Sequence, residues 1–167
     1  MKKITIGITG ATGSLGKAII KNNKKIIFNR FNGDIRNRKA VFDWINRSNV
    51  KIVFHLAAIV PIIQVNSNTT KARQVNYDGT KNIVDACFKK EIKWFFFSST
   101  SHVYKSSRKK ISERFEKKPL SYYGQTKLWA ENYIIKKFKS SNTKFFIGRI
   151  FSTTNKSQKK NYLVPDL

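Results

Sequence analysis

Short apolar runs alternate with longer, more polar segments along this chain. Five runs, at residues 4–9, 25–29, 51–56, 93–98 and 144–149, have the length and composition of buried β-strands. The segments between them carry apolar side chains at helical spacing: Val41, Trp44 and Ile45; then Ala72, Val75, Gly79, Ile83 and Ala86; then Ala130, Tyr133, Ile134 and Phe138. This alternation predicts an α/β fold, a doubly wound parallel sheet with helices on both faces.

One segment departs from the pattern. Residues 105–118 are polar and basic and show no apolar period, so we predict a loop there. Two interpretations remain open for this loop: a solvated surface loop, or a lid that meets an anionic substrate.

Composition limits the classes of protein that this chain can belong to. With 167 residues and 40% hydrophobic content it can bury one core, so we expect a single globular domain. The formal charge of +25 would attract polyanions. The basic residues are spread along the whole chain, however, without zinc-finger spacing or an RNA-binding motif. We therefore favour compositional drift over a nucleic-acid interface, and we assign no metal ligands.

The cysteine content, the first residues and the most apolar run of the chain together indicate a soluble protein. Cys87 is the only cysteine, which excludes an internal disulfide and suits a reducing compartment. Residues 1–3 lead directly into an apolar strand, unlike a signal peptide. The most apolar run, 52–65, is too short to cross a bilayer. We expect a cytoplasmic protein without a membrane segment, and we interpret His55 within that run as a packed, hydrogen-bonded core residue.

A glycine-rich turn, TGATGSLG at residues 9–16, follows the first strand. Gly10 can adopt a backbone conformation that other residues avoid, Gly13 lets the backbone approach a pyrophosphate, and Gly16 permits close helix packing. The helix that follows points its positive N-terminus at the phosphates. A glycine-rich turn that binds no cofactor is the alternative.

The second predicted strand ends without a carboxylate. NAD-binding proteins usually have an acidic residue there for the ribose 2′-hydroxyl. Here Asn29 is followed by Arg30, whose guanidinium suits a 2′-phosphate, so NADP is favoured over NAD. The alternative is that Arg30 simply faces water.

A Ser/Thr cluster and a Tyr/Lys pair form a candidate catalytic set. Hydride transfer to a carbonyl needs a group that moves the hydroxyl proton, and a free tyrosine, with a pKa of about 10, is poorly suited at neutral pH. An ammonium one helical turn away would stabilise the phenolate, and Lys127 stands at that spacing from Tyr123. The run Ser98-Ser99-Thr100 begins at the end of the fourth predicted strand, and the Thr100 hydroxyl would hydrogen-bond the reacting oxygen. Taken alone, Ser98-Ser99-Thr100 would be a turn or a helix cap.

These motifs, in this order, resemble the extended short-chain dehydrogenase/reductase family over nearly the whole chain. The resemblance implies a Rossmann-like fold, NADP or NAD as cofactor, and a nucleotide-sugar substrate. It assigns catalysis to Thr100, Tyr123 and Lys127. It also makes Asp34 an adenine contact, for which a helix cap is the alternative, and lets Asn76 support the backbone near the site. The cofactor contacts that it implies are Gly10, Thr12, Gly13, Ser14, Leu15, Gly16, Arg30, Asp34, Ile35, Leu56, Ala57, Ala58, Asn76, Ser98 and Lys127.

The chain departs from the family pattern at three places. Dehydratases carry an acidic pair after the catalytic Thr, where this chain has Ser101 and His102, so a dehydratase is disfavoured. Lys105 replaces a glycine after the Val-Tyr pair, and Ser152 replaces an Asn that supports the substrate pocket in many relatives.

The resemblance also suggests how the chain is divided. We expect residues 1–152 to form the dinucleotide-binding domain with the catalytic residues. Residues 153–167 would begin a substrate-binding part that is largely missing, so we expect cofactor binding without measurable turnover. Homodimers are common in the resembling family.

The function that we favour is a nicotinamide-dependent sugar-nucleotide oxidoreductase or epimerase in surface polysaccharide or deoxysugar synthesis. Among subtypes we favour a 4-keto-sugar reductase, because the second strand suits NADP. The alternative is a non-catalytic dinucleotide-binding module or an inactive fragment, which the presence of Thr100, Tyr123 and Lys127 together disfavours.

Overall fold

Five parallel strands form one sheet in the computed structural model, which describes residues 4–60 and 62–152. The spatial order is β2-β1-β3-β4-β5. All five predicted strands are confirmed, with ends that differ from prediction by at most two residues: β1 Thr5–Thr9, β2 Ile27–Arg30, β3 Ile52–His55, β4 Trp94–Thr100 and β5 Lys144–Ile150.

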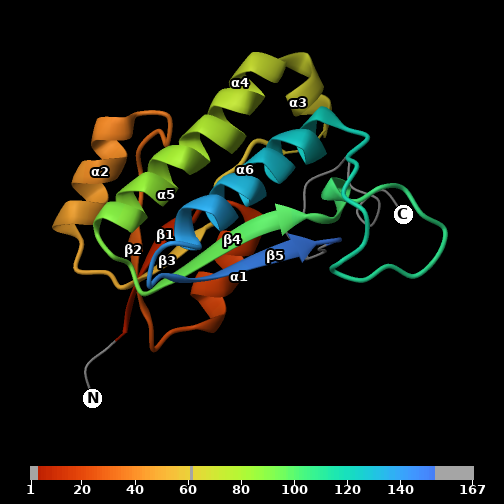
Figure 1. Cartoon of the computed structure of the whole chain (residues 1–167). Helices are drawn as coiled ribbons and strands as arrows, with labels where there is room; N and C mark the ends of the chain where they lie inside the picture. Colours follow the sequence, from red (N-terminus) through yellow and green to blue (C-terminus); the bar gives the residue numbers. More distant parts are fainter. Residues whose placement is uncertain (1–3, 61, 153–167) are drawn as a thin grey trace.

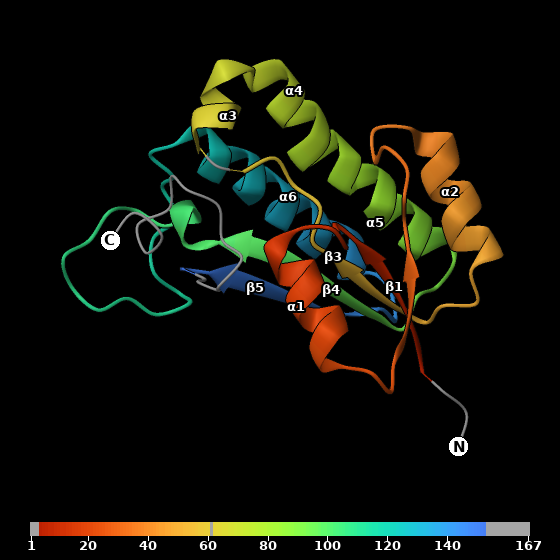
Figure 2. The ribbon, with the colours of Figure 1, turned by 180° about the vertical axis from the view of Figure 1, so that it is seen from behind.

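Helices lie on both faces of this sheet, as the doubly wound pattern predicts. Figures 1 and 2 show α1 on one face and α2, α5 and α6 on the other. The helical segments are α1 Ser14–Asn22, α2 Arg38–Arg47, α3 Ile62–Ser67, α4 Thr69–Arg73, the π-helix η1 Gln74–Gly79, α5 Thr80–Lys89, the 3-10 turn η2 Ser101–Val103, and α6 Tyr122–Phe138.

The core lies between the sheet and the α2, α5 and α6 layer. Alternate residues of a strand point to opposite faces, so Phe95 and Phe97 of β4 face this layer together. Both are buried, as are Ile83 of α5 and Ile134 of α6. Cys87 is also buried there, and burial raises the pKa of its thiol.

The order of the strands determines where a ligand can bind. The connection after β1 leads to β2 on one side, and the connection after β2 leads back to β3 on the other side of β1. In open parallel sheets such a switch point leaves a crevice outside the carboxyl ends of the two strands. The glycine turn after β1 and the segment after β3 meet at this crevice.

Two helical features of the structure were not predicted, whereas the loop at 105–118 was. The stripe from Ala72 to Ala86 is interrupted by the π-helix η1, and α3 precedes it. The predicted loop at 105–118 is confirmed, since it contains no helix or strand. The proposed division at residue 153 falls outside the described residues. Within the described residues, no helix combines the length and apolar character that crossing a bilayer requires.

Candidate active site

The glycine turn adopts the geometry that its sequence predicts. Gly10 has φ +69°, a left-handed conformation that favours glycine. A Cβ on Gly10 would lie 2.7 Å from the Ala57 backbone nitrogen, and a Cβ on Gly16 would overlap the Gly10 carbonyl. Gly13 differs, because the nearest atom to a Cβ there is the Gly10 oxygen at 3.4 Å. The first and third glycines thus serve close backbone packing, while the second leaves space above the turn.

Helix α1 begins directly at this turn. Gly13 is its N-cap residue and contributes no side chain to cap it, and no acidic residue lies in the first turn. The amides of Ser14, Leu15 and Gly16 are therefore at the positive end of the helix dipole, the arrangement that binds phosphate in dinucleotide folds. The space above Gly13 and these amides fit the pyrophosphate of a dinucleotide.

Thr9 joins the turn to the end of β3. Its hydroxyl oxygen accepts hydrogen bonds from the backbone amides of Leu56 and Ala57, each at 3.2 Å. Together with the close contact of Gly10 and Ala57, these bonds fix the segment 56–58 beside the turn. Leu56, Ala57 and Ala58 are partly buried there.

His55 is a core residue, as predicted. It is fully buried, its Nδ1 lies 2.7 Å from Thr9 Oγ1, and its Nε2 lies 2.9 Å from Thr80 Oγ1. Thr80 donates its own proton to the Asn76 carbonyl, so it accepts from Nε2–H, and Thr9 donates to Nδ1. Burial, with a smaller contribution from the charge of Lys127, lowers the pKa of His55 to about 3. The imidazole is therefore neutral and has both nitrogens occupied.

Asn76 lies within the π-helix and is fully buried. Its side-chain oxygen accepts from the Ile59 amide at 2.7 Å, and its nitrogen donates to the Ile59 carbonyl and to Thr126 Oγ1. Thr126 in turn donates to the Tyr123 carbonyl. Asn76 therefore acts on the site by holding the backbone after β3 against the start of α6. A π-turn at such a position is typical of functional sites.

The end of β4 meets the start of α6. Thr100 is nearly buried, and its hydroxyl accepts from the His102 amide at 3.2 Å, so it also caps η2. Ser121 caps α6 through the Gly124 amide. A Cβ on Gly124 would overlap the His102 carbonyl, and the rings of His102 and Tyr123 meet edge to face at 5.9 Å. The chain thus holds η2 and the Tyr123 turn in direct contact.

Lys127 is buried one turn further along α6. Its Nζ lies 4.0 Å from the centre of the Phe97 ring, and only 2% of the residue is exposed. Burial lowers the pKa of Lys127 to about 7, against the opposing attraction of Glu131. Tyr123 and Lys127 both lie on α6, as predicted, with Thr100 and the partly buried Ser98 on β4, the strand that carries Phe97.

A buried ion pair behind these residues was not predicted. Glu131, fully buried on α6, accepts from the Ser99 hydroxyl and from both Nε and Nη2 of Arg149 on β5. These bonds raise the pKa of Arg149. Arg149 also donates to Tyr104 Oη at 2.8 Å and to the Glu113 carbonyl at 2.9 Å. The position of Glu131, one helical turn after Lys127, was the sequence signal that could have indicated a buried charge there.

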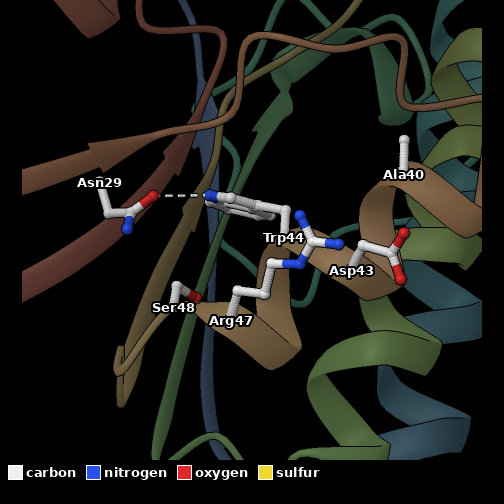
Figure 3. Close-up of a pocket in the computed structure, with 6 residues that line it drawn as sticks. All are labelled: Asn29, Ala40, Asp43, Trp44, Arg47 and Ser48. Atoms are coloured by element: carbon white, nitrogen blue, oxygen red, sulfur yellow. Dashed lines mark hydrogen bonds between the residues drawn. The ribbon is translucent and has the colours of Figure 1, made fainter.

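At the end of β2, the side chains of Asn29 and Arg30 lie in different environments. Asn29 accepts from Trp44 Nε1 at 2.7 Å, on the α2 side, where a cavity of about 450 Å³ lies (Figure 3). Arg30, the next residue, is exposed. No acidic side chain of β2 competes with it for a ribose or phosphate.

The structure of the segment after β2 excludes the helix-cap alternative for Asp34. Asp34 does not cap α2, because Asn37 does so by accepting from the Ala40 amide. The Asp34 carboxylate instead accepts from the Arg36 backbone and side chain, which lowers its pKa. Ile35 is buried in the core, so any cofactor contact there would come from its backbone.

Comparison with known proteins agrees with this geometry. The family model described as "NAD dependent epimerase/dehydratase family" matches residues 6–163. An uncharacterized UDP-glucose epimerase, YtcB of Bacillus subtilis (strain 168), is 37% identical over 83 residues, which are 49% of this chain and 26% of the relative.

Two solved structures have similar folds. The dTDP-4-dehydrorhamnose reductase of Bacillus anthracis str. Ames, in complex with NADP, is 25% identical with a TM-score of 0.80, over 90% of this chain and 54% of that one. The UDP-glucose 4-epimerase of Thermus thermophilus, in complex with NAD, is 19% identical with a TM-score of 0.80, over 87% and 54%.

The chain thus spans about half the length of these structures. The family match, in contrast, extends over nearly all of it, and includes the glycine turn, the end of β4 and the start of α6. This chain belongs to the NAD dependent epimerase/dehydratase family.

Proposed function

We propose that this chain binds a nicotinamide dinucleotide in the crevice at the carboxyl ends of β1 and β3 and acts on a nucleotide-linked sugar. The buried position of Lys127, one turn after Tyr123, carries the proposal. A lysine buried on an aromatic ring without a full counter-charge is costly for folding alone and is typical of functional sites. The glycine turn supplies the second half of the argument, because Gly10 and Gly16 are sterically required while Gly13 leaves room for phosphates.

Three side chains would handle the proton and the charge of the reaction. The bound dinucleotide supplies or accepts a hydride. Tyr123 would exchange the proton of the sugar hydroxyl, and the Lys127 ammonium would stabilise its phenolate. Thr100 would donate a hydrogen bond to the reacting oxygen. Because the pKa of Lys127 is about 7, its charged fraction changes within the neutral range.

The more specific proposal is an NADP-dependent 4-keto-sugar reductase. Arg30 is exposed at the end of β2, and Asn29 is engaged by Trp44, so a 2′-phosphate would meet a guanidinium and no carboxylate. The similar Bacillus anthracis reductase, in complex with NADP, supports this choice.

Titration with NADPH and with NADH, followed by nicotinamide fluorescence at about 0.02 M and about 0.15 M salt, tests the binding proposal. We expect saturable binding that persists at the higher salt and is tighter for NADPH. Arg30→Gln should reduce NADPH binding and leave NADH binding unchanged, with Arg47→Gln as the matched control. A folded protein that binds neither dinucleotide would contradict the proposal, and equal loss of both in Arg30→Gln would contradict the NADP preference.

The catalytic proposal has its own test. Tyr123→Phe should keep NADPH binding and abolish any oxidation of NADPH by dTDP-4-dehydrorhamnose, measured by absorbance of the nicotinamide. The wild-type chain is assayed both alone and with further polypeptide from a relative. If it binds NADPH but reduces this sugar in neither assay, the reductase assignment is wrong while cofactor binding stands.

A further inference from the structure

We infer that this chain carries its own site for the diphosphate of a nucleoside diphosphate-linked substrate, in a cavity of about 780 Å³ beside η2 and the loop 105–118. Lys109 and Lys110 would contact the phosphates. The inference rests on the proposed function and goes beyond it, because it places substrate recognition in the part of the chain that carries the dinucleotide fold.

The cavity lies next to the candidate catalytic residues. Ser101, His102 and Ser121 are among the residues that line it. Ser101 follows Thr100 directly, Ser121 caps the helix that carries Tyr123, and the His102 ring touches the Tyr123 ring. Figure 1 shows the loop 105–118 beyond the carboxyl ends of β4 and β5, on the side of the sheet where α6 begins. A ligand there would present one end to Thr100 and Tyr123.

The charge of the lining favours an anion. Lys105, Lys109 and Lys110 line the cavity, and none of the described residues that line it is acidic. Lys105 is paired with Glu116 at 2.7 Å, whereas neither Lys109 nor Lys110 takes part in an ion pair with any described residue. Ser107 bonds both the amide and the carbonyl of Lys109, which fixes the turn that presents this lysine. Two cations and the neighbouring serine hydroxyls suit phosphate oxygens.

The loop is held in place by its surroundings. The Lys105 amide donates to the Glu116 carbonyl at 2.9 Å and closes the base of the loop. Arg149 donates to the Glu113 carbonyl, and the buried Glu131 holds Arg149 from behind. The lysines therefore belong to a loop anchored to β5 and α6, so the cavity wall is largely formed before a ligand arrives.

The remaining wall is apolar and favours a nucleotide over a small inorganic anion. Leu120 is 82% exposed and Phe151 is 63% exposed, unusual values for such side chains, and both line this cavity with Ile111. An exposed aromatic face can stack on a base or a sugar ring. Hydroxyl groups, cations and apolar side chains thus line the same cavity, and together they suit the sugar, the diphosphate and the nucleoside of such a substrate.

Calorimetric titration with UDP, UDP-glucose and inorganic pyrophosphate at about 0.15 M salt tests this inference, since that salt screens diffuse attraction to the high net charge. We expect UDP and UDP-glucose to bind and pyrophosphate to bind more weakly. The double variant K109Q/K110Q should weaken UDP binding about tenfold, the effect of losing one to two charge-assisted hydrogen bonds. Its NADPH affinity should not change, because the glycine turn lies elsewhere.

The matched control is K24Q/K25Q, an adjacent exposed lysine pair that precedes β2 at the opposite edge of the sheet. It removes the same charge and should leave UDP binding unchanged. Equal UDP affinity in the two double variants would overturn the inference, because it would indicate either no role for the loop lysines or an effect of bulk charge. Pyrophosphate binding as tight as UDP would overturn it too. If the wild type binds UDP in this manner and binds no dinucleotide, the proposed function fails while this site stands.

Discussion

The two faces of the sheet differ in how completely they are covered. On the face toward α2, α5 and α6, Val53, Phe95 and Phe97 are at most 1% exposed. On the other face α1 is the helix that covers the strands among the described residues, as Figures 1 and 2 show. There Trp94 is 50% exposed and Phe146 62% exposed.

Exposure on the α1 face rises along the sheet from β1 to β5. Ile8, Phe54, Phe96 and Phe146 stand opposite one another on four adjacent strands. Ile8 is buried, Phe54 and Phe96 are partly buried, and Phe146 stacks on Phe96 at 5.8 Å while its outer side is open. The covered face, in contrast, holds the buried ionisable groups of the site, so the pKa shifts arise where packing excludes water.

The largest expected effect comes from truncating one phenylalanine on each face. Phe95→Ala should lower the free energy of unfolding by about 3–5 kcal/mol, because it opens a cavity between β4 and α6. Phe146→Ala should cost less than about 1 kcal/mol, because its side chain is already largely in water. Urea unfolding of both variants measures the two values. Similar costs would show that the α1 face is as well packed as the other.

The next effect concerns the buried ion pair on the covered face. Glu131→Gln should lower the free energy of unfolding by about 3 kcal/mol, since it leaves the Arg149 guanidinium with a weakened partner in a largely buried position. Glu116→Gln removes the exposed partner of Lys105 and should lower the free energy of unfolding far less, because ion pairs in water contribute little to stability.

The same two variants also separate folding from loop anchoring. Trypsin cleavage within the loop 105–118 should become faster in Glu131→Gln, because Arg149 would hold the Glu113 carbonyl less firmly. A Glu131→Gln protein with unchanged stability and unchanged cleavage would show that this ion pair does not anchor the loop.

The local patterns were enough to predict the strands and the glycine turn. Runs such as 93–98 are continuous and apolar because the strand is enclosed by its neighbours, and Gly10 and Gly16 are required by contacts of the turn with itself and with the segment after β3. The Tyr123 and Lys127 spacing likewise needs only one helix. Apart from the contact of Gly10 with the segment after β3, these features depend on the geometry of a single turn, strand or helix, which the spacing of residues in the sequence can indicate.

Most of the features that were missed depend on how a segment is packed or where it begins. Glu131 and Arg149 meet only because α6 packs across β5. The Asp34 carboxylate binds Arg36, two residues further on, and Asn37 rather than Asp34 caps α2, which begins at Arg38. The π-turn at η1 leaves an apolar stripe that spacing alone cannot tell from an ordinary helix. The exposure of Phe146 depends on what covers β5, which the sequence of β5 does not contain.

A pH series should sharpen the contrast between the faces. The pKa of His55 is about 3 in the folded chain and about 6.5 when unfolded. Between these values the unfolded chain binds a proton that the folded chain does not, so the free energy of unfolding falls as pH falls below about 6.5. The slope should approach about 1.4 kcal/mol per pH unit.

His55→Gln preserves an acceptor for Thr9 and a donor for Thr80, and should remove most of this slope between about pH 6.5 and about pH 5. His102→Gln is the control, because that imidazole is exposed. Urea midpoints at several pH values provide the measurement. A slope that persists in His55→Gln would mean that other groups cause the acid sensitivity.

The smallest effect compares two lysines that lie over aromatic rings. Lys137 lies over Phe88 at 4.7 Å beside α5 and pairs with Asp85, whereas Lys144 lies over Trp94 at 5.3 Å at the edge of the α1 face. Partial burial strengthens such contacts, so Lys137→Gln should cost about 0.5–1 kcal/mol and Lys144→Gln less than about 0.5 kcal/mol. Urea unfolding in about 0.15 M salt measures both. Because Trp94 is half exposed, a larger cost for Lys144→Gln would mean that the α1 face is closed to solvent around Trp94, and the contrast between the two faces would then be limited to Phe146.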